Sequence, residues 1–210
     1  MACIVLMIEM STEKGHDTRE HLSEVALGLF LKYGYDNVSL TNIASQASVS
    51  KGGLTYHFQS KTEILQSAIQ FFFKKITTST SDQSSPDSFD EFVHGMFKMV
   101  TQINEMLFQL TGIESEDLNY QRLFLDAKKN LKHLDLMQMY YGPAIQGMNL
   151  MLEHFKETES LAKDVDSELL AFHIMSVIEG SYVLAFFDDK ATVDDHLSNL
   201  ADDFIRRYSR

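Results

Sequence analysis

The stretch of sequence that decides the fold is residues 39–58, which read SLTNIASQASVSKGGLTYHF. Ser39 is a residue type that caps helices, and it stands directly before a short amphipathic segment, Leu40 to Ala47. The apolar residues of this segment share one face at helical spacing: Leu40, Ile43, Ala44 and Ala47. Ser48-Val49-Ser50 then predicts a turn, after which Ser50 caps a second short helix, Lys51 to about Phe58.

Two short helices joined by such a turn form a helix-turn-helix, a motif whose second helix lies in the major groove of DNA. The backbone must approach the DNA closely, so small residues favour contact at the start of that helix: Ser50, Gly52 and Gly53. Lys51 and Thr55 are predicted to reach base edges or phosphates. The side chains predicted to donate to flanking phosphates are Tyr56, His57 and Lys61.

The sequence on either side of the motif predicts two more helices. The first begins at Asp17 or Thr18 and is ended by Gly34. Its apolar residues follow the 3.6-residue period: Leu22, Val25, Ala26, Leu29, Phe30 and Tyr33. After the motif, Ser60 and Glu63 form a capping box that starts a helix running to about Ile76.

The rest of the chain predicts a larger helical body. The whole sequence holds only 2 prolines and 10 glycines in 210 residues, which favours helices joined by short connections. Ser85-Pro86 predicts the start of a helix that ends at about Leu110, before Thr111-Gly112. Further helices are predicted at residues 115–130, at 134–156 with a kink or break at Pro143, at 167–187 and at 193–208.

We therefore predict an all-α fold of about nine helices, with a three-helix head followed by a larger helical domain. Residues 1–16 are expected to be a flexible or poorly ordered extension, and residues 17–76 the helix-turn-helix domain with its connecting fourth helix. Residues 77–210 are expected to form the second domain, because the Ser/Thr-rich stretch from Thr77 to Ser85 interrupts the helical pattern.

The charge is unevenly distributed along the chain. The net charge is −12, yet residues 11–75 carry seven Lys/Arg and six Asp/Glu, whereas residues 76–210 carry eleven and twenty-three. Only the first of these segments is not repelled by DNA phosphates. The single cysteine, Cys3, excludes a disulfide framework and favours a reducing, cytoplasmic location. The apolar stretch 169–187 is interrupted by polar residues, so we expect a buried helix and no membrane contact.

From Gly34 to Lys61 the sequence resembles the signature of the TetR family of bacterial regulators, and the similarity extends from about residue 18 to residue 70. The matching residues stand in the family's order and spacing: Phe30, Gly34, Ile43, Ala44, Ala47, Val49, Ser50, Gly52, Leu54, His57, Phe58 and Lys61. The resemblance implies a homodimer whose first three helices bind DNA, whose fourth links head to body, and whose remaining helices bind an effector and dimerise.

Carried over position by position, the resemblance assigns the phosphate- and base-contacting start of the second helix to Ser39 and Thr41. It assigns the recognition helix to Ser50–Tyr56 and a phosphate-binding lysine to Lys61. Two positions depart from the family's pattern. Ser48 stands where glycine is usual in the turn, and Thr55 stands where tyrosine is common, with Tyr56 displaced by one residue.

A dimer interface is predicted near the C-terminus, where residues 178–187 resemble the penultimate helix of the family's second domain. A helix that is apolar nearly all round must be covered on both sides, and Gly180 permits close approach of a symmetry mate. The predicted interface residues on this helix and the next are Ile178, Gly180, Ser181, Leu184, Phe187, Leu197, Leu200 and Phe204. The alternative is that the helix belongs to the core of one protomer.

The body is rich in Met, Phe and Tyr, which suit a pocket for a small lipophilic effector but also an ordinary core. The candidate ligand-binding residues are Met99, Met106, Tyr120, Phe124, Tyr140, Tyr141 and Met148. The acidic body favours a cationic or neutral effector over an anion. No nucleophile elbow, phosphate loop or metal-ligand motif is present, so we predict no catalysis, no cofactor and no metal site.

The sequence thus predicts a DNA-binding transcriptional regulator that acts as a homodimer on a palindromic operator and is released by a ligand. Two alternatives stay open. The body of a TetR-like regulator can bind a protein partner instead of a small effector. Alternatively, the chain is an all-α small-molecule-binding or interaction module whose N-terminal helices only pack and bind no DNA.

Overall fold

The computed structural model describes residues 2–81, 85–112, 120–132, 135, 137–185 and 190–210. The chain divides into two compact units, Met1–Thr77 with Tyr120–Leu134, and Thr78–Asn119 with Asp135–Arg210. In the described residues the regular structure is helical, with nine α-helices and one π-helix, apart from an isolated bridge between Leu161 and Ser209. The predicted all-α fold is confirmed.

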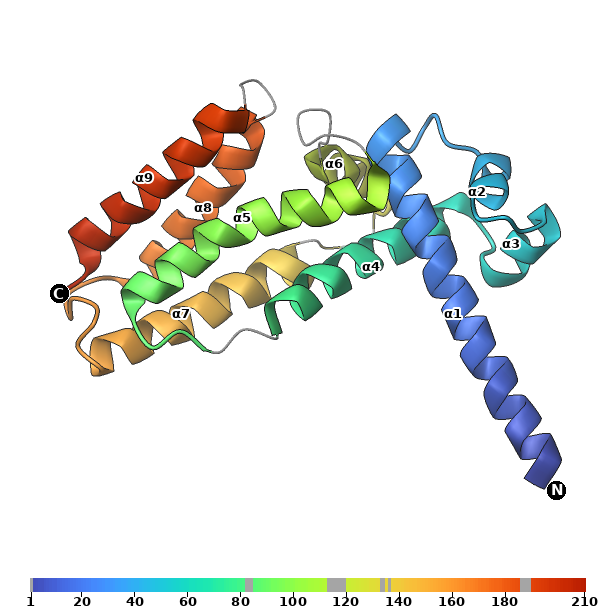
Figure 1. Cartoon of the computed structure of the whole chain (residues 1–210), viewed down its shortest axis with the longest axis horizontal. Helices are drawn as coiled ribbons and strands as arrows, with labels where there is room; N and C mark the ends of the chain where they lie inside the picture. Colours follow the sequence, from blue (N-terminus) through green and yellow to red (C-terminus); the bar gives the residue numbers. More distant parts are fainter. Residues whose placement is uncertain (1, 82–84, 113–119, 133–134, 136, 186–189) are drawn as a thin grey trace. The chain divides into compact units, whose positions relative to one another are not determined.

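The first unit contains α1 (Ala2–Tyr33), α2 (Leu40–Gln46), α3 (Lys51–His57), α6 (Tyr120–Asn130) and most of α4 (Lys61–Ser81) (Figure 1). The two short helices and their joining turn stand where the sequence predicts them. The prediction had placed residues 120–130 in the second domain, whereas the structure packs α6 with the N-terminal helices.

Several helices differ in length from the prediction. The first begins at Ala2 instead of Asp17 or Thr18, while flexibility of residues 1–16 stays a prediction. The fourth continues past Ile76 to Ser81, since that segment holds neither Gly nor Pro and the Thr77 hydroxyl donates to the Phe73 carbonyl at 2.9 Å. The helix expected from Ser85 begins at Phe89, because Ser88 caps it by accepting from the Glu91 N–H at 3.2 Å.

The core of the first unit is built from the apolar faces of its helices. Fully or nearly fully buried side chains come from α1, α2, α3, α4 and α6: Leu22, Ala26, Leu27, Phe30, Ile43, Leu54, Ile64, Leu65, Phe72 and Leu123. Tyr33, predicted on the core face of the first helix, is 49% exposed. Aromatic rings join α4 to α6, with the Phe72 ring centroid 5.9 Å from Tyr120 and 5.8 Å from Phe124.

Two turns in this unit adopt left-handed backbone conformations. Gly34, which ends α1, has φ +76°, and Ser48, between α2 and α3, has φ +56°. Glycine adopts such a φ without steric cost, whereas a residue with a Cβ does so at the cost of strain. Ser48, which stands where the family usually has glycine, therefore has a strained backbone.

Replacing Ser48 with glycine is expected to raise the free energy of unfolding by about 0.5–1 kcal/mol, because relief of the strain outweighs the added freedom of the unfolded chain. In a chain of this length the melting temperature should rise by about 2–4 °C per kcal/mol. Thermal melts of the matched control Ser45→Gly, in the exposed helical part of α2, should show a decrease instead. Equal effects at both positions would contradict the strain.

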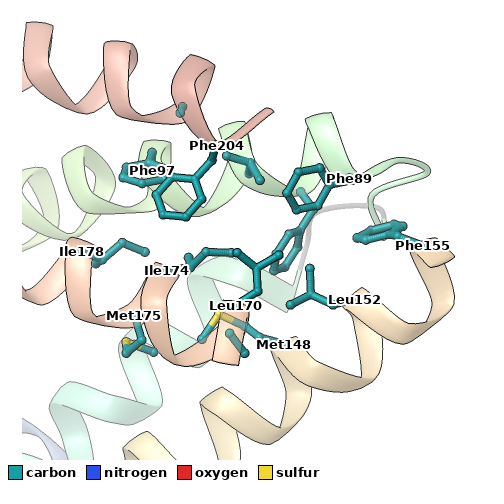
Figure 2. Close-up of a cluster of buried hydrophobic side chains, with 14 of the residues drawn as sticks. Phe89, Phe97, Met148, Leu152, Phe155, Leu170, Ile174, Met175, Ile178 and Phe204 are labelled. Atoms are coloured by element: carbon teal, nitrogen blue, oxygen red, sulfur yellow. The ribbon is translucent and has the colours of Figure 1, made fainter. Parts of the chain in front are cut away.

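The second unit contains α5 (Phe89–Thr111), η1 (Met137–Tyr141), α7 (Gly142–Glu157), α8 (Ser167–Ala185) and α9 (Lys190–Tyr208). Figure 2 shows its core, in which Leu170, Ile174 and Ile178 of α8 point toward the rings contributed by α5 and α9. Large buried side chains from these helices include Phe89, Phe92, Phe97, Met148, Leu152, Phe155 and Phe204. At Pro143, where the sequence predicts a kink or break, the helical backbone is not interrupted but changes type: a π-helix ends at Tyr141 and α7 begins at Gly142, with Pro143 in its first turn.

The long apolar stretch that starts near residue 169 lies in α8, which presents one buried face and one exposed face. None of the helices formed by the described residues combines the length and hydropathy that a bilayer span requires.

Candidate nucleic-acid interface

The caps predicted for the helix-turn-helix are present. The Ser39 hydroxyl accepts from the Asn42 N–H at 3.1 Å, and the Asn42 side chain accepts in return from the Ser39 N–H at 2.9 Å. The Ser50 hydroxyl accepts from the Gly53 N–H at 3.0 Å. Between the two helices the Val49 N–H donates to the Ala44 carbonyl at 3.0 Å. These local hydrogen bonds set where α3 begins relative to α2.

The two glycines at the start of α3 are not required by the chain itself. Neither has a positive φ, and a Cβ on Gly52 would lie 3.8 Å from the Ser50 hydroxyl oxygen, with the corresponding distance at Gly53 being 3.4 Å. Glycine in a helix costs up to about 1 kcal/mol relative to alanine. The packing of the protomer therefore does not require glycine at either position.

The exposed side chains of α3 differ in what they can offer DNA. Tyr56 is 85% exposed, and its ring meets the His57 ring edge-on at 5.1 Å. The Thr55 hydroxyl donates to the Gly52 carbonyl at 3.1 Å, so its proton is used within the helix. Lys51 and Thr41 are exposed. The Tyr56 hydroxyl is therefore a better placed donor for a phosphate than the Thr55 hydroxyl.

Acidic side chains are absent from the sequence of this region. Residues 37–62 contain no Asp or Glu, although the chain carries 30 of them, and the same stretch contains Lys51 and Lys61. A DNA phosphate approaching α2 or α3 therefore meets no carboxylate from that stretch.

Lys61 is held by residues near the end of α1. Its ammonium lies 4.1 Å from the centre of the Tyr35 ring, a cation–π contact, and the side chain is half-buried. Burial lowers the pKa of Lys61, while Asp36 and Asp126 act in the opposite direction. The predicted phosphate-binding lysine is thus engaged with Tyr35, and its contact with DNA stays a prediction.

The sequence analysis missed Arg19, which links three helices. From α1 its guanidinium donates to the His57 carbonyl at the end of α3, and it pairs with Glu63 of α4 at 2.9 Å. The guanidinium carbon also lies 4.2 Å from the centre of the Phe58 ring. Arg19 is 38 residues from His57 in sequence, so periodicity and capping rules gave no signal for this contact.

Glu63 has a wider role than the predicted capping box. Its N–H donates to the Ser60 hydroxyl at 3.1 Å, but its carboxylate accepts from the Gln59 N–H at 2.8 Å instead of the Ser60 N–H. The hydrogen bond from Arg19, followed by that from Gln59, lowers the pKa of Glu63. The carboxylate therefore holds the segment between α3 and α4 against α1.

The helix α6 is fastened to the turn that precedes α2. The Tyr35 N–H donates to the Asp126 carboxylate at 3.0 Å, and Lys129 pairs with Asp36 at 2.9 Å. A side chain at Gly34 would meet the guanidinium of Arg122. We call these contacts between α6 and residues 34–36 the α6 clamp. It joins a helix from the middle of the chain to the DNA-binding head.

The predicted dimer residues fall on two different faces. Four of them are buried in the core of their own protomer, which supports the alternative that the sequence left open for these positions: Ile178, Ser181, Leu197 and Phe204. Gly180 and Leu200 are half-buried, Leu184 is 65% exposed, and Phe187 lies outside the described residues. These four side chains are buried because α8 packs on α5, α7 and α9, and because α9 also packs on α5.

A different set of α8 residues forms an exposed apolar stripe. Leu169 is 64% exposed, Phe172 56% and Val183 40%, and they recur at helical spacing with Ser176 and Gly180. A Cβ added to Gly180 would meet nothing within 4 Å. We call Leu169, Phe172, Ser176, Gly180, Val183 and the adjacent Leu184 the α8 stripe.

The candidate ligand residues are likewise divided. Tyr120 and Phe124 are buried in the aromatic cluster of the first unit, and Met148 is buried in the core of the second. Met99, Met106, Tyr140 and Tyr141 are half-buried in the second unit. Two of the seven residues thus belong to the first unit and five to the second, and their role in ligand binding stays a prediction.

Comparisons with known proteins agree with the geometry of α2 and α3. Residues 22–68 match the family described as "Bacterial regulatory proteins, tetR family". The chain is 19% identical to the HTH-type transcriptional regulator PksA of Bacillus subtilis, over 87% of this chain and 85% of PksA. It is 24% identical to the HTH-type transcriptional regulator TtgR of Pseudomonas putida, over 83% and 82% of the two chains.

A solved structure shows the same fold. The crystal structure of a putative TetR-family transcriptional regulator from Rhodococcus sp. superimposes with a TM-score of 0.73 at 15% identity, covering 90% of this chain and 99% of that one. The matched segment contains the capped helix-turn-helix, and the overall alignments continue through the helical body. The chain is therefore a transcriptional regulator of the TetR family of bacterial regulatory proteins, with a DNA-binding helix-turn-helix.

Proposed function

We propose that the chain is a ligand-released repressor that acts as a homodimer on a palindromic operator. The observation that carries this proposal is the exposed face of α3, where two glycines leave the backbone bare and Tyr56 stands 85% exposed. Repression is the commoner outcome in the family that the chain belongs to.

On the DNA, Gly52 and Gly53 let the start of α3 enter the major groove, and Lys51 reaches a base edge or phosphate from the same turn. Tyr56 donates its hydroxyl to a phosphate beside the groove. Ser39 and Thr41 contact the backbone from the start of α2. Ser50 also keeps its capping hydrogen bond, because a hydroxyl that accepts from an N–H can still donate its own proton, whereas the Ser39 hydroxyl already donates to the Asn42 side-chain oxygen.

The experiment that tests the DNA contacts is a mobility shift with the DNA upstream of the chain's own gene, at several salt concentrations. Replacing Lys51 with alanine should weaken binding about tenfold and reduce the salt dependence by about one phosphate contact per protomer. Tyr56→Phe removes only the hydroxyl and should weaken binding by about tenfold to a hundredfold, since a hydrogen bond to a charged group is worth about 1.5–3 kcal/mol.

The matched control is Lys32→Ala, which removes an exposed lysine from α1 outside the helix-turn-helix. It should leave operator affinity within about twofold, since exposed charges distant from the contact are largely screened by salt. The assignment fails if both α3 variants bind like the wild type while melting at the wild-type temperature. No retardation of any DNA by the wild type at low salt would favour the non-DNA-binding module.

The α8 stripe supports the homodimer. Apolar side chains that are this exposed in a row are typical of a surface covered by a partner, and an interface with twofold symmetry uses the same patch from both copies. Gly180 lets two α8 helices approach closely, because no side chain fills the space beside it. Two recognition helices must then be about 34–36 Å apart to enter successive major grooves of a palindrome.

The α6 clamp supports release by a ligand. Along the chain α6 lies between α5 and η1, which belong to the second unit, while α6 itself packs in the first. In this proposal, a ligand that shifts α5 or η1 acts on the clamp at residues 34–36 through the chain that joins these helices to α6. A ligand that binds the two states with different affinity changes DNA affinity by the coupling free energy, typically about 1–3 kcal/mol.

A further inference from the structure

The two units differ strongly in charge, and α6 is the reason. This helix lies in the acidic part of the sequence but packs in the first unit. Residues 1–77 carry seven Lys/Arg and seven Asp/Glu, whereas residues 120–134 carry four Lys/Arg and one Asp. The first unit therefore has a net charge of +3, and the second, with seven Lys/Arg and twenty-two Asp/Glu, has −15. The excess positive charge of the DNA-binding unit comes entirely from the segment that contains α6.

The cations of this segment are on its exposed side. The buried side chains of α6 are apolar or aromatic. We call the four exposed cations the basic face of α6: Arg122, Lys128, Lys129 and Lys132. Lys128 lies in the last turn of the helix, and Lys132 lies in the turn that follows it. Within the described part of the chain, neither of these two lysines has an ion-pair partner, so their charges are available to a molecule outside the protomer.

The basic face adjoins residues that are predicted to contact DNA, and Tyr35 connects them. The Tyr35 N–H donates to the Asp126 carboxylate of α6 at 3.0 Å, and its ring centre lies 4.1 Å from the Lys61 ammonium. Lys61 is the predicted phosphate-binding lysine at the start of α4. Tyr35 also stands four residues before Ser39, which caps α2. One turn of the chain therefore contacts α6 and also holds the beginnings of the proposed DNA surface.

The carboxylate of Asp36 does not neutralise these cations. It pairs with Lys129 at 2.9 Å, and the hydrogen bond and charge of Lys129, followed by the charges of Lys61 and Arg122, lower the pKa of Asp36. Three cations thus act on one carboxylate. Both side chains of the Lys129–Asp36 pair are 65% exposed, and an exposed ion pair stabilises a fold little. Lys129 can therefore exchange this carboxylate for a phosphate at small cost.

We propose that the basic face of α6 is a second DNA contact, which binds backbone phosphates beside the base pairs that α3 reads. The inference goes beyond the proposed contacts of α2, α3 and Lys61. Phosphate contacts position a protein on the duplex and add affinity for any sequence, so this face strengthens binding to operator and to unrelated DNA alike. Cations near the C-terminus of a helix also stabilise it through the helix dipole, but that role alone predicts no effect on DNA binding.

A mobility shift of the full-length protein tests the contact on two duplexes, the DNA upstream of the chain's own gene and the same length of scrambled sequence. The variant Lys128→Gln/Lys132→Gln removes two charges per protomer and keeps polar side chains. It should weaken binding to both duplexes about tenfold or more and reduce the salt dependence by about two phosphate contacts per protomer. The ratio of the two affinities should change by less than about twofold, because phosphates carry no sequence information.

The matched control is Lys98→Gln/Lys163→Gln, which removes the same charge from exposed positions of the second unit. It should leave both affinities within about twofold of the wild type, since charges distant from the contact are largely screened by salt. Melting temperatures check that each variant is folded. The proposal is wrong if the folded α6 variant keeps the wild-type affinities and salt dependence. It is also wrong if the control loses as much affinity as the α6 variant, because net charge and not position then decides.

Ethylation of single DNA phosphates locates the contact and separates it from the contacts of α3. Phosphates whose ethylation weakens binding of the wild type but not of the α6 variant mark the place of α6 on the duplex. They should differ from the phosphates that Lys51→Ala or Tyr56→Phe no longer senses. Identical interference patterns for the wild type and the α6 variant overturn the proposal. Weakened binding by the two α3 variants with wild-type binding by the α6 variant contradicts this inference and leaves the proposed α3 contacts intact.

Discussion

Phe172→Glu is expected to convert the proposed homodimer into monomers and to lower operator affinity at least a hundredfold. Phe172 is 56% exposed in the α8 stripe, so the substitution costs the protomer fold little. In a dimer with twofold symmetry each substitution occurs twice, and two carboxylates are buried in an apolar interface. Loss of a central aromatic side chain typically costs at least about 2 kcal/mol per copy. The dimer dissociation constant should therefore rise by about a thousandfold or more.

Operator affinity falls when dimerisation is lost, because the recognition helix of a monomer binds one half-site alone. Sedimentation equilibrium measures assembly, and a mobility shift at the same protein concentration measures DNA binding. Leu150→Glu is the matched control, since Leu150 is 66% exposed on α7 and lies outside the stripe. It should remain dimeric. Dimers of Phe172→Glu with the wild-type dissociation constant would show that another surface pairs the protomers.

Arg19→Ala is expected to lower the free energy of unfolding by about 2–3 kcal/mol, because it removes a charged hydrogen bond to the His57 carbonyl and a cation–π contact with Phe58. The pair with Glu63 adds little to that sum, since its two side chains are 41% and 35% exposed. Chemical denaturation measures this change.

Arg19 also positions the recognition helix, so DNA binding should weaken even where the variant is fully folded. At a temperature well below its melting point, Arg19→Ala should bind operator at least tenfold more weakly, because the end of α3 is no longer held to α1. Arg19→Lys should restore part of the affinity through a single donor. Lys74→Ala is the matched control: it breaks the exposed Lys74–Glu20 pair between α1 and α4 without touching α3. If folded Arg19→Ala binds operator with wild-type affinity, Arg19 stabilises the fold but does not position α3 for DNA.

The pH dependence gives a second readout for Arg19. The pKa of Glu63 is lowered in the folded protein, chiefly by the hydrogen bond from Arg19. The stability that Glu63 contributes is therefore present above the ordinary pKa of glutamate and is lost as pH falls through the lowered value. In Arg19→Ala this acid-dependent loss should be smaller, which urea titrations at a series of acidic pH values can measure.

Local signals predicted the helix-turn-helix well. Ser39 and Ser50 cap the helices that the sequence assigned to them, and Gly34 ends the first helix in the left-handed conformation that glycine favours. These features depend on hydrogen bonds and dihedral angles within a few residues, so a single stretch of sequence contains the information. The Ser88 cap was missed because Ser85-Pro86 presents the same signal three residues earlier.

The sequence by itself determined the helical class, the capped helix-turn-helix and the acidic character of the body, since propensity, capping and charge are properties of neighbouring residues. Only the tertiary structure decided that α6 packs with the DNA-binding head, that Arg19 holds the end of α3, and that Ile178 and Phe204 face inward while Phe172 faces outward. A helix that is apolar nearly all round does not reveal which side its own chain covers. That choice follows from the packing of helices far apart in sequence, which no local pattern records.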